Sequence, residues 1–323
     1  MTAKDLVAAA GSARPSVLGL DVGGTATRWA LMTLDGELVA EGVAAGFSGA
    51  QMQRASEHER GSVSTRLHAI ADQVRVASRR CELCAVCAGI TGVAGPGDGA
   101  VQARRMLAHA FALPESRVTV MSDIELTCRA AVAAVEGYVV YAGTGSIAAF
   151  IDAEGELQRA GGRGVLLDDA GGGYWIAREA LRRVWRREDE HPGAWRGSPM
   201  ARALFTAVGG DASIFSVRYL MERERGVVGL LALVVAKHAD DDALAAEILS
   251  DAGVELARLA SAMALRYGQR KIVVTGRAST LHPLIESAMR RSMPSGAPIE
   301  FRQVEAHVAA ARLAVAKCVN TVL

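Results

Sequence analysis

The stretch Ser16–Thr27, SVLGLDVGGTAT, decides how the rest of the chain is interpreted. Its first half is mostly apolar and predicts a short strand, which runs into two adjacent glycines, Gly23 and Gly24. Glycine has no Cβ, so backbone N–H groups at such a turn can approach an anion closely, and the hydroxyls of Thr25 and Thr27 add uncharged donors. The pattern predicts a loop that binds phosphate, although a plain hairpin with a glycine turn has the same local sequence.

Asp21 stands just before this turn and points a carboxylate at the same place. A carboxylate beside bound phosphates makes sense only if a cation lies between them, and Mg²⁺ is the cation that proteins usually hold through one or two carboxylates together with phosphates. We therefore expect Asp21 to hold Mg²⁺ through water.

A second glycine turn occurs in YVVYAGTGS, residues 138–146. When the chain is shifted by 119 residues against itself, Gly24-Thr25-Ala26-Thr27 falls on Gly143-Thr144-Gly145-Ser146. The same shift places the Asp35-Gly36 turn, which predicts a hairpin, on the equivalent Glu154-Gly155 turn. Two matches at one offset indicate an internal duplication, with one anion-binding turn in each half facing a shared cleft.

Asp123 closes the predicted strand at residues 118–121 and precedes a predicted helix over residues 125–135. A carboxylate at such a strand-to-helix junction stands in front of the helix N-terminus, and one hypothesis is that it takes part in catalysis there. The alternative is that Asp123 is only the N-cap of that helix, since Asp is among the preferred capping residues.

Length and composition narrow the class of protein. The chain has 323 residues, half of them hydrophobic, which predicts two domains with ample cores. Its formal net charge of +1 gives no long-range attraction to nucleic acid or to an anionic membrane. We expect residues 1–15 to be a loose tail, and we find no apolar run long enough to span a bilayer.

The five cysteines indicate reduced thiols and a cytoplasmic location. Three of them, Cys81, Cys84 and Cys87, have a spacing that can ligate an iron–sulfur cluster. They fall on a predicted strand, however, where residues three apart point to opposite faces. The alternation therefore favours core thiols over cluster ligands.

Taken together, these motifs resemble the N-acetylglucosamine kinase and BadF/BadG/BcrA/BcrD ATPase branch of the superfamily of sugar kinases, heat-shock ATPases and actin. The resemblance runs over about residues 17–316 and includes both glycine turns and Asp123. It also includes Gly161-Gly162-Arg163-Gly164, the pair Asp168-Asp169 followed by Tyr174-Trp175-Ile176, and the strand and turn Val273-Val274-Thr275-Gly276. The resemblance implies an α/β fold of two duplicated ribonuclease-H-like lobes with an ATP/sugar cleft between them.

The domain boundaries follow from that fold. They place the N-terminal lobe at residues 16–135, with a C-terminal helix over 306–323 packing back on it, and the C-terminal lobe at residues 136–305. The resemblance also implies a homodimer.

The resemblance further implies transfer of the γ-phosphoryl group of MgATP to an amino sugar, N-acetylglucosamine first, at the 6-hydroxyl. Asp123 would be the general base, and Asp21 would hold Mg²⁺. The residues implied for ATP are Gly23, Gly24, Thr25, Thr27, Gly143, Thr144, Gly145, Ser146 and Gly276. Those implied for the sugar are Ser48, Thr91, Gly92, Gly162 and Asp169, with Asp168 as the alternative to Asp169.

Three positions on the sugar side depart from the family pattern. Arg163 replaces a tryptophan, Ala170 replaces a glutamate, and no asparagine occurs in the loop at residues 46–51. Glucosamine or another hexose therefore stays open as the acceptor. An ATPase that activates a reductase and a sensor that binds sugar and ATP without turnover also stay open. P-loop, dinucleotide-binding, hydrolase-elbow and zincin motifs are absent from the sequence.

Overall fold

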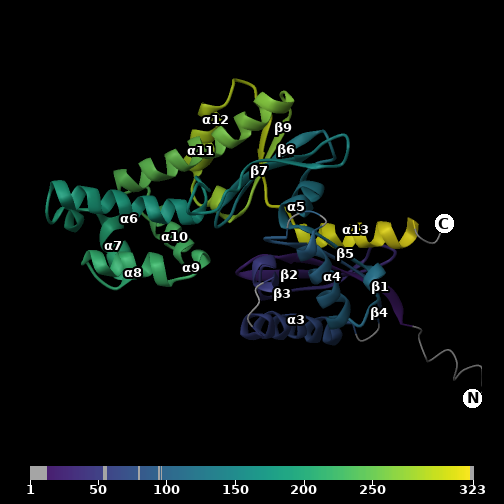
Figure 1. Cartoon of the computed structure of the whole chain (residues 1–323). Helices are drawn as coiled ribbons and strands as arrows, with labels where there is room; N and C mark the ends of the chain where they lie inside the picture. The colour runs from purple at the N-terminus through teal and green to yellow at the C-terminus, as the bar shows by residue number, and fades with distance from the viewer. Residues whose placement is uncertain (1–12, 54–56, 79–80, 94, 96, 321–323) are drawn as a thin grey trace, which may run out of the picture. The chain divides into compact units, whose positions relative to one another are not determined.

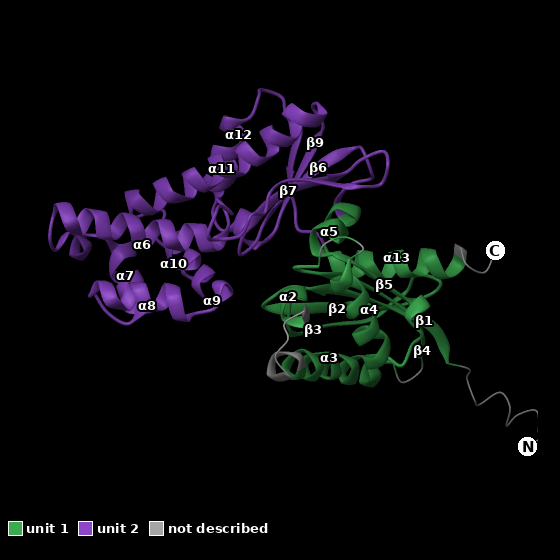
Figure 2. Cartoon of the chain, viewed as in Figure 1, with its two compact units in different colours: residues 1–130, 305–323 green, residues 131–304 purple. Residues whose placement is uncertain are grey.

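The computed structural model describes residues 13–53, 57–78, 81–93, 95 and 97–320 (Figure 1). Most of the predicted tail, residues 1–12, and the last three residues of the predicted C-terminal helix lie outside the described residues. The chain divides into two compact units, residues 1–130 with 305–323 and residues 131–304 (Figure 2).

Unit 1 contains a five-stranded sheet of order β3-β2-β1-β4-β5. Its strands are β1 Arg14–Val22, β2 Ala26–Thr33, β3 Leu38–Ala45, β4 Cys81–Ile90 and β5 Val118–Ser122. The first three strands are antiparallel neighbours, whereas β4 and β5 run parallel to β1. The carboxyl ends of β1, β4 and β5 therefore meet at one edge of the sheet.

Helices cover both faces of this sheet (Figure 1). On one face, Leu18, Leu20 and Ile90 pack with α3 Glu57–Ala77 and α4 Asp98–Ala110. On the other face, Val17 and Cys87 pack with α13 Ala306–Asn320. The remaining helices of the unit are α2 Gly49–Gln53 and α5 Asp123–Ala131, the last residue of which is assigned to unit 2.

Unit 2 contains a second five-stranded sheet of order β10-β9-β6-β7-β8. Its strands are β6 Gly137–Ala142, β7 Ser146–Ile151, β8 Leu157–Gly161, β9 Lys271–Thr275 and β10 Ile299–Phe301. The helices of this unit form one continuous core with the sheet. They are α6 Gly173–Glu190, α7 Pro199–Val208, α8 Ser213–Glu222, α9 Arg225–Gly229, α10 Leu231–Lys237, α11 Ala243–Tyr267 and α12 Pro283–Ser292. Most of these helices lie between β8 and β9 in the chain.

The two sheets confirm the predicted duplication. Strands β6 to β10 repeat the order and the directions of β1 to β5. The hairpin turns repeat as well: the N–H of Thr33 donates to Glu37 O over 2.9 Å, and 119 residues later the N–H of Asp152 donates to Glu156 O over 3.0 Å. Gly36 and Gly155 both have positive φ, which explains why glycine stands at this position of each turn.

Candidate active site

Asp21 and Asp123 lie at the carboxyl edge of the unit 1 sheet. Asp21 pairs with Gly89 across β1 and β4, and Asp123 follows β5 directly. Gly89 has no side chain, and a Cβ there would lie 2.5 Å from Leu126 Cδ2 of α5. This close packing draws the first turn of α5, and with it Asp123, toward Asp21.

The charge of Asp123 acts on Asp21. Burial and, next, the negative charge of Asp123 together raise the pKa of Asp21 from 3.8 to about 6, while Arg28 on β2 acts in the opposite direction. A carboxylate whose charge is disfavoured in this way gains from a neighbouring cation. Two carboxylates alone do not saturate Mg²⁺, whose other ligands would be phosphate oxygens and water, so the donor set fits this ion as part of a nucleotide complex.

Ser122, and not Asp123, caps helix α5. The Ser122 hydroxyl accepts the N–H of Glu125 over 3.2 Å, which is the N-cap bond. Asp123 occupies the first helical position, where its Oδ1 accepts the N–H of Ile124 over 2.9 Å. The capping explanation for Asp123 is therefore removed, because its neighbour fills that role.

The first glycine turn connects β1 and β2 as predicted. The N–H of Gly23 donates to Ala26 O over 3.0 Å, and Gly24 and Thr25 are exposed. A Cβ on Gly24 would have no atom within 4 Å, so this position faces open space. The exposed part of the turn can therefore receive a ligand without any rearrangement of its neighbours.

Thr27 and Ser146 occupy equivalent positions of the two turns, and both are buried. The Thr27 hydroxyl donates to Ala45 O over 3.3 Å, and the Ser146 hydroxyl donates to Ala170 O over 2.6 Å. Both hydroxyls thus stabilise the turns from within. We leave these two residues out of the proposed phosphate contacts, which we keep for Thr25 and Thr144.

The residues of unit 1 that the resemblance implies for the sugar lie in segments joined by backbone hydrogen bonds beside the first glycine turn. The N–H of Gly49 donates to Thr91 O over 2.8 Å, and the N–H of Thr91 donates to Val22 O over 2.9 Å. Ser48 is the N-cap of α2, because Gln51 Oε1 accepts the Ser48 N–H over 2.9 Å in the reciprocal arrangement of a capping box. The segments that hold Ser48, Thr91 and Gly92 therefore lie side by side.

Gly46 and Gly49 contact the first glycine turn and the loop after β4, and we did not single them out from the sequence. A Cβ on Gly46 would lie 2.1 Å from Gly23 O, and one on Gly49 would lie 2.8 Å from Gly92 O. Because these two residues are glycines, the loop after β3 can contact both the first glycine turn and the loop after β4. The Ser-x-x-Gln capping pattern was the available signal for this loop.

The second glycine turn connects β6 and β7 and is bonded to the start of α6. The N–H of Gly173 donates to Gly143 O over 2.8 Å, and the N–H of Tyr174 donates to Thr144 O over 2.9 Å. Gly145 lies against the side chain of Asp169, since a Cβ there would be 2.2 Å from Asp169 Oδ2. The turn and the aspartate predicted for the sugar are therefore direct neighbours within unit 2.

Asp169 and Asp168 have different surroundings. Asp169 is buried, has a positive φ of 53°, and accepts the N–H of Gly164 over 3.0 Å. Burial raises the pKa of Asp169, the Asp168 charge adds to this rise, and the backbone N–H of Gly164 and the charge of Arg225 oppose it. Asp168 instead forms a 3.3 Å ion pair with Arg258 of α11. Asp168 is thus engaged in an ion pair, whereas the Asp169 carboxylate lies beside the second glycine turn.

Gly162 and Gly276 lie near the same turn. Gly162 has a φ of 63° and its N–H donates to Ser146 O over 3.1 Å. Gly276 has a φ of 98°, and a Cβ there would lie 2.4 Å from Ala142 O, next to Gly143. Both positions require glycine for the fold itself, but only Gly162 is exposed, whereas Gly276 is buried.

The three clustered cysteines lie on β4 but not on one face of it. A bulge at Cys84 shifts the register with β1 between Ser16 and Val17. As a result Cys81 packs with α3 and α4, whereas Cys87 packs on the opposite face with α13. Burial also raises the pKa of Cys87 to about 12, which keeps it a thiol. These positions disfavour a shared iron–sulfur cluster within one chain.

A cavity of about 250 Å³ occurs elsewhere in unit 2, between α6, α7 and the start of α11. It is lined by Arg187, Trp195 and Asp242, among others, and by none of the predicted site residues. The Asp242 carboxylate is occupied there, since it caps α11 and accepts the hydroxyl of Ser198.

A known protein family matches the part of the chain that contains these candidate site residues. The profile of the BadF/BadG/BcrA/BcrD ATPase family matches residues 18–295, which is most of the chain and includes both glycine turns, Asp123 and Asp169. The chain belongs to this family. The resemblance noted from the sequence is thereby confirmed.

The individual proteins that this chain resembles share little sequence identity with it. The N-acetylmuramic acid/N-acetylglucosamine kinase of Clostridium acetobutylicum is 27% identical over 176 residues, 54% of this chain and 55% of that protein. The chain therefore spans about half the length of the curated relative that it matches. A candidate N-acetylglucosamine kinase of Chromobacterium violaceum has a TM-score of 0.70 at 24% identity, over 94% of this chain and 99% of the other.

A glucokinase of the ROK family from Streptomyces griseus, solved with glucose and AMPPNP, has a TM-score of 0.57 at 15% identity, over 92% of this chain and 98% of the other. At such identities the solved structures establish the fold alone. They confirm the predicted two-lobe α/β fold class. Within the described part of the chain, no helix is both long and apolar enough to cross a membrane.

Proposed function

We propose that the protein is an ATP-dependent sugar kinase that transfers the γ-phosphoryl group of MgATP to a hydroxyl of an amino sugar. The observation that carries the proposal is the duplicated glycine turn, one in each unit, together with the Asp21 and Asp123 carboxylates beside the first turn. A phosphoryl group is transferred mainly by positioning and charge neutralisation, and this set supplies both.

In the proposed reaction Asp123 accepts the proton of the attacking hydroxyl. A new bond forms between the sugar oxygen and the γ-phosphorus as the bond to the β,γ-bridging oxygen breaks, and ADP leaves. The backbone of Gly24, Thr25, Gly143 and Thr144 binds phosphate oxygens. Asp21 would hold Mg²⁺, which neutralises phosphate charge when bound.

Asp169 accepts hydrogen bonds from sugar hydroxyls in this proposal, and Ser48, Thr91, Gly92 and Gly162 line the acceptor. Backbone hydrogen bonds of Thr91 and Gly162 to the ends of the neighbouring strands support this assignment. N-acetylglucosamine, phosphorylated on its 6-hydroxyl, is our first candidate because the curated relative is named for it. Glucosamine or another hexose is the alternative, since Arg163 and Ala170 depart from the family pattern. We also propose a homodimer and, from the five free cysteines, a cytoplasmic location.

A screen of ADP release over hexoses, amino sugars and N-acetylated sugars tests the proposal. We expect ADP release that depends on one sugar class and that is lost in Asp123→Asn, with the product identified by mass spectrometry. ADP release that no sugar stimulates would contradict the proposed function.

A further inference from the structure

The cavity between α6, α7 and the start of α11 lies apart from the proposed catalytic residues and has a volume of about 250 Å³. Its inner wall is apolar and buried, and consists of Val184 of α6, Ala201 of α7 and Leu244 of α11. A space of this size far exceeds the room that one water molecule needs, so a small organic molecule fits it. A mostly apolar lining with few polar groups is typical of sites for small ligands.

Two carboxylates hold the walls of this cavity in place. The Glu188 carboxylate accepts two backbone N–H groups of the loop after α6, that of Gly193 over 2.8 Å and that of Trp195 over 2.6 Å. Asp242 accepts backbone N–H groups at the starts of both α7 and α11. The fold itself uses both carboxylates in this way, and the cavity is therefore formed before any ligand arrives.

Helices α6 and α11 run antiparallel beside the cavity. A Cβ on Gly171, just before α6, would lie 2.9 Å from Leu256 Cδ2, in the middle of α11. Further along α6, Arg183 pairs with Glu247 of α11 over 2.9 Å. Arg187 follows one helical turn later and lines the cavity together with the start of α11. Successive turns of α6 therefore meet successively earlier turns of α11.

Arg187 meets no acidic side chain on α11. One turn before Glu247, the residue of α11 on the same face is Ala243, whose methyl group cannot pair with a guanidinium group. Among the residues that the structure describes, no carboxylate lies within ion-pair distance of Arg187. Asp241, the other exposed charge of the lining, already pairs with His238 over 3.2 Å. The cavity thus combines an apolar wall with one unpaired cation.

We propose that this cavity binds a small carboxylate with an apolar body, and that its carboxylate pairs with Arg187 where an acidic side chain at position 243 would otherwise lie. A guanidinium group offers two parallel N–H donors, which match the two oxygens of a carboxylate. The apolar body would leave water and contact Leu244 and Trp195. This inference does not depend on the proposed kinase function, because none of the predicted site residues lines the cavity.

Calorimetry on the full chain tests the proposal with two acids, 3-phenylpropanoate and 4-methylpentanoate, and with the primary amide of each. The amide keeps the apolar body and removes the charge. We expect at least one acid to bind about tenfold to a hundredfold more tightly than its amide, the usual range for hydrogen bonds to a charged group. Arg187→Gln should reduce the affinity for that acid to the affinity for its amide.

A second variant, Ala243→Glu, places a carboxylate on α11 one turn before Glu247. This carboxylate should pair with Arg187 and occupy part of the cavity, so that the acid no longer binds. Melting temperatures establish that both variants are folded.

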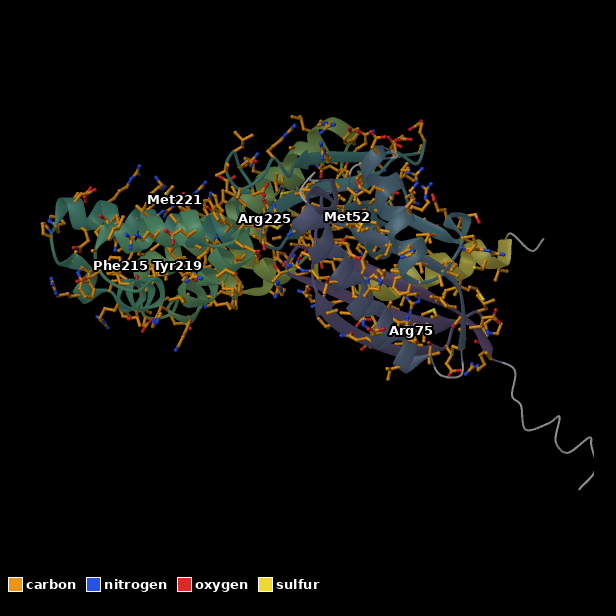
Figure 3. The ribbon with its side chains drawn as sticks, turned by 60° about the horizontal axis from the view of Figure 1, so that its bottom comes forward. Met52, Arg75, Phe215, Tyr219, Met221 and Arg225 are labelled. Carbon is orange, nitrogen blue, oxygen red and sulfur yellow. The ribbon has the colours of Figure 1, made fainter. Side chains whose placement is uncertain are left out.

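Arg225→Gln is the matched control, because Arg225 is also an exposed arginine of unit 2 but belongs to α9 and does not line the cavity. Figure 3 shows Arg225 at one end of the helical segment from which Phe215, Tyr219 and Met221 also project. This variant should bind the acid as wild type does.

Three results would overturn the proposal. The first is that neither acid binds to the wild-type protein. The second is that the amides bind as tightly as the acids, since the cavity would then select for apolar surface and not for charge. The third is that Arg187→Gln and Ala243→Glu both bind the acid as wild type does, since the acid would then occupy another site.

Discussion

At the scale of single residues, the account depends on two aspartates with different tasks. Asp21 is held in the sheet with a pKa raised to about 6, and Asp123 begins a helix that Ser122 caps. Removing the charge of either residue leaves the backbone hydrogen bonds of the edge intact. Changes in activity can therefore be separated from changes in folding.

The substitution Asp123→Asn should lower kcat by roughly a hundredfold to ten-thousandfold, because it removes the proton acceptor. Binding of MgATP should be unchanged, since both glycine turns are untouched. The control is Ser122→Ala, which should cost about 1 kcal/mol of stability through the lost cap. A fully active Asp123→Asn enzyme, measured by ADP release, would remove Asp123 as the base.

Asp21 predicts an unusual dependence of stability on pH. Its pKa in the folded protein lies above the ordinary value of 3.8, so the charged form fits the fold worse than the protonated form. The ligand-free protein therefore loses stability as pH rises from about 4 to about 6 and stays at the lower level above that. The difference in free energy of unfolding between Asp21→Asn and wild type should therefore grow by about 1 kcal/mol from pH 5 to pH 7.5, in favour of the variant.

Thermal unfolding of both proteins without Mg²⁺ or nucleotide measures this difference. Asp35→Asn is the control, because Asp35 is exposed in the first hairpin and has a pKa that its bond to Thr33 lowers. Its difference from wild type should not change over the same range. If the stability of Asp21→Asn and that of wild type changed with pH in the same way, Asp21 would not carry an unfavourable buried charge at this edge of the sheet.

At the scale of elements, the two glycine turns are the repeated functional unit. Each connects an antiparallel pair of strands, presents one hydroxyl residue, Thr25 or Thr144, and turns the next hydroxyl inward to a backbone carbonyl. The outward part is thus available to a ligand while the inward part stabilises the turn.

Gly24→Val and Gly143→Val should weaken MgATP binding, because a branched side chain occupies space that phosphate oxygens need. Gly24 is the cleaner position, since its Cβ would meet no protein atom within 4 Å and folding should be unaffected. Gly61→Ala, in the exposed part of α3 with equally open space, is the control and should bind MgATP as wild type does. Unchanged affinity of a folded Gly24→Val variant in calorimetry would remove the first turn from the nucleotide site.

Local signals in the sequence were sufficient for the elements that carry the site. The acidic-Gly turns predicted the hairpins, because Gly36 and Gly155 have the positive φ that such tight turns need. The inward direction of Thr27 and Ser146 could not be predicted, because it depends on the path of β3 and of the loop before Ala170. The cap of α5 is Ser122; the sequence left Asp123 open as the cap, as the alternative to its catalytic role, because both residues are good capping residues.

At the scale of the whole molecule, the two units have the same sheet topology, and each carries one glycine turn. Transfer of a phosphoryl group to a sugar and not to water requires that water be excluded. We therefore expect the units to close on their ligands. Small-angle scattering with the sugar and a non-hydrolysable ATP analogue should give a smaller radius of gyration than the free protein, and an unchanged radius in every ligand state would count against closure.

The destination of the γ-phosphoryl group distinguishes a sugar kinase from an ATPase. The measurement follows the label from γ-labelled ATP with an accepted sugar from the screen, with wild type and with Asp123→Asn. We predict labelled sugar phosphate in equal amount to ADP for wild type, and almost none for the variant. Labelled inorganic phosphate formed in equal amount to ADP, at a rate that does not depend on the sugar, would contradict the account.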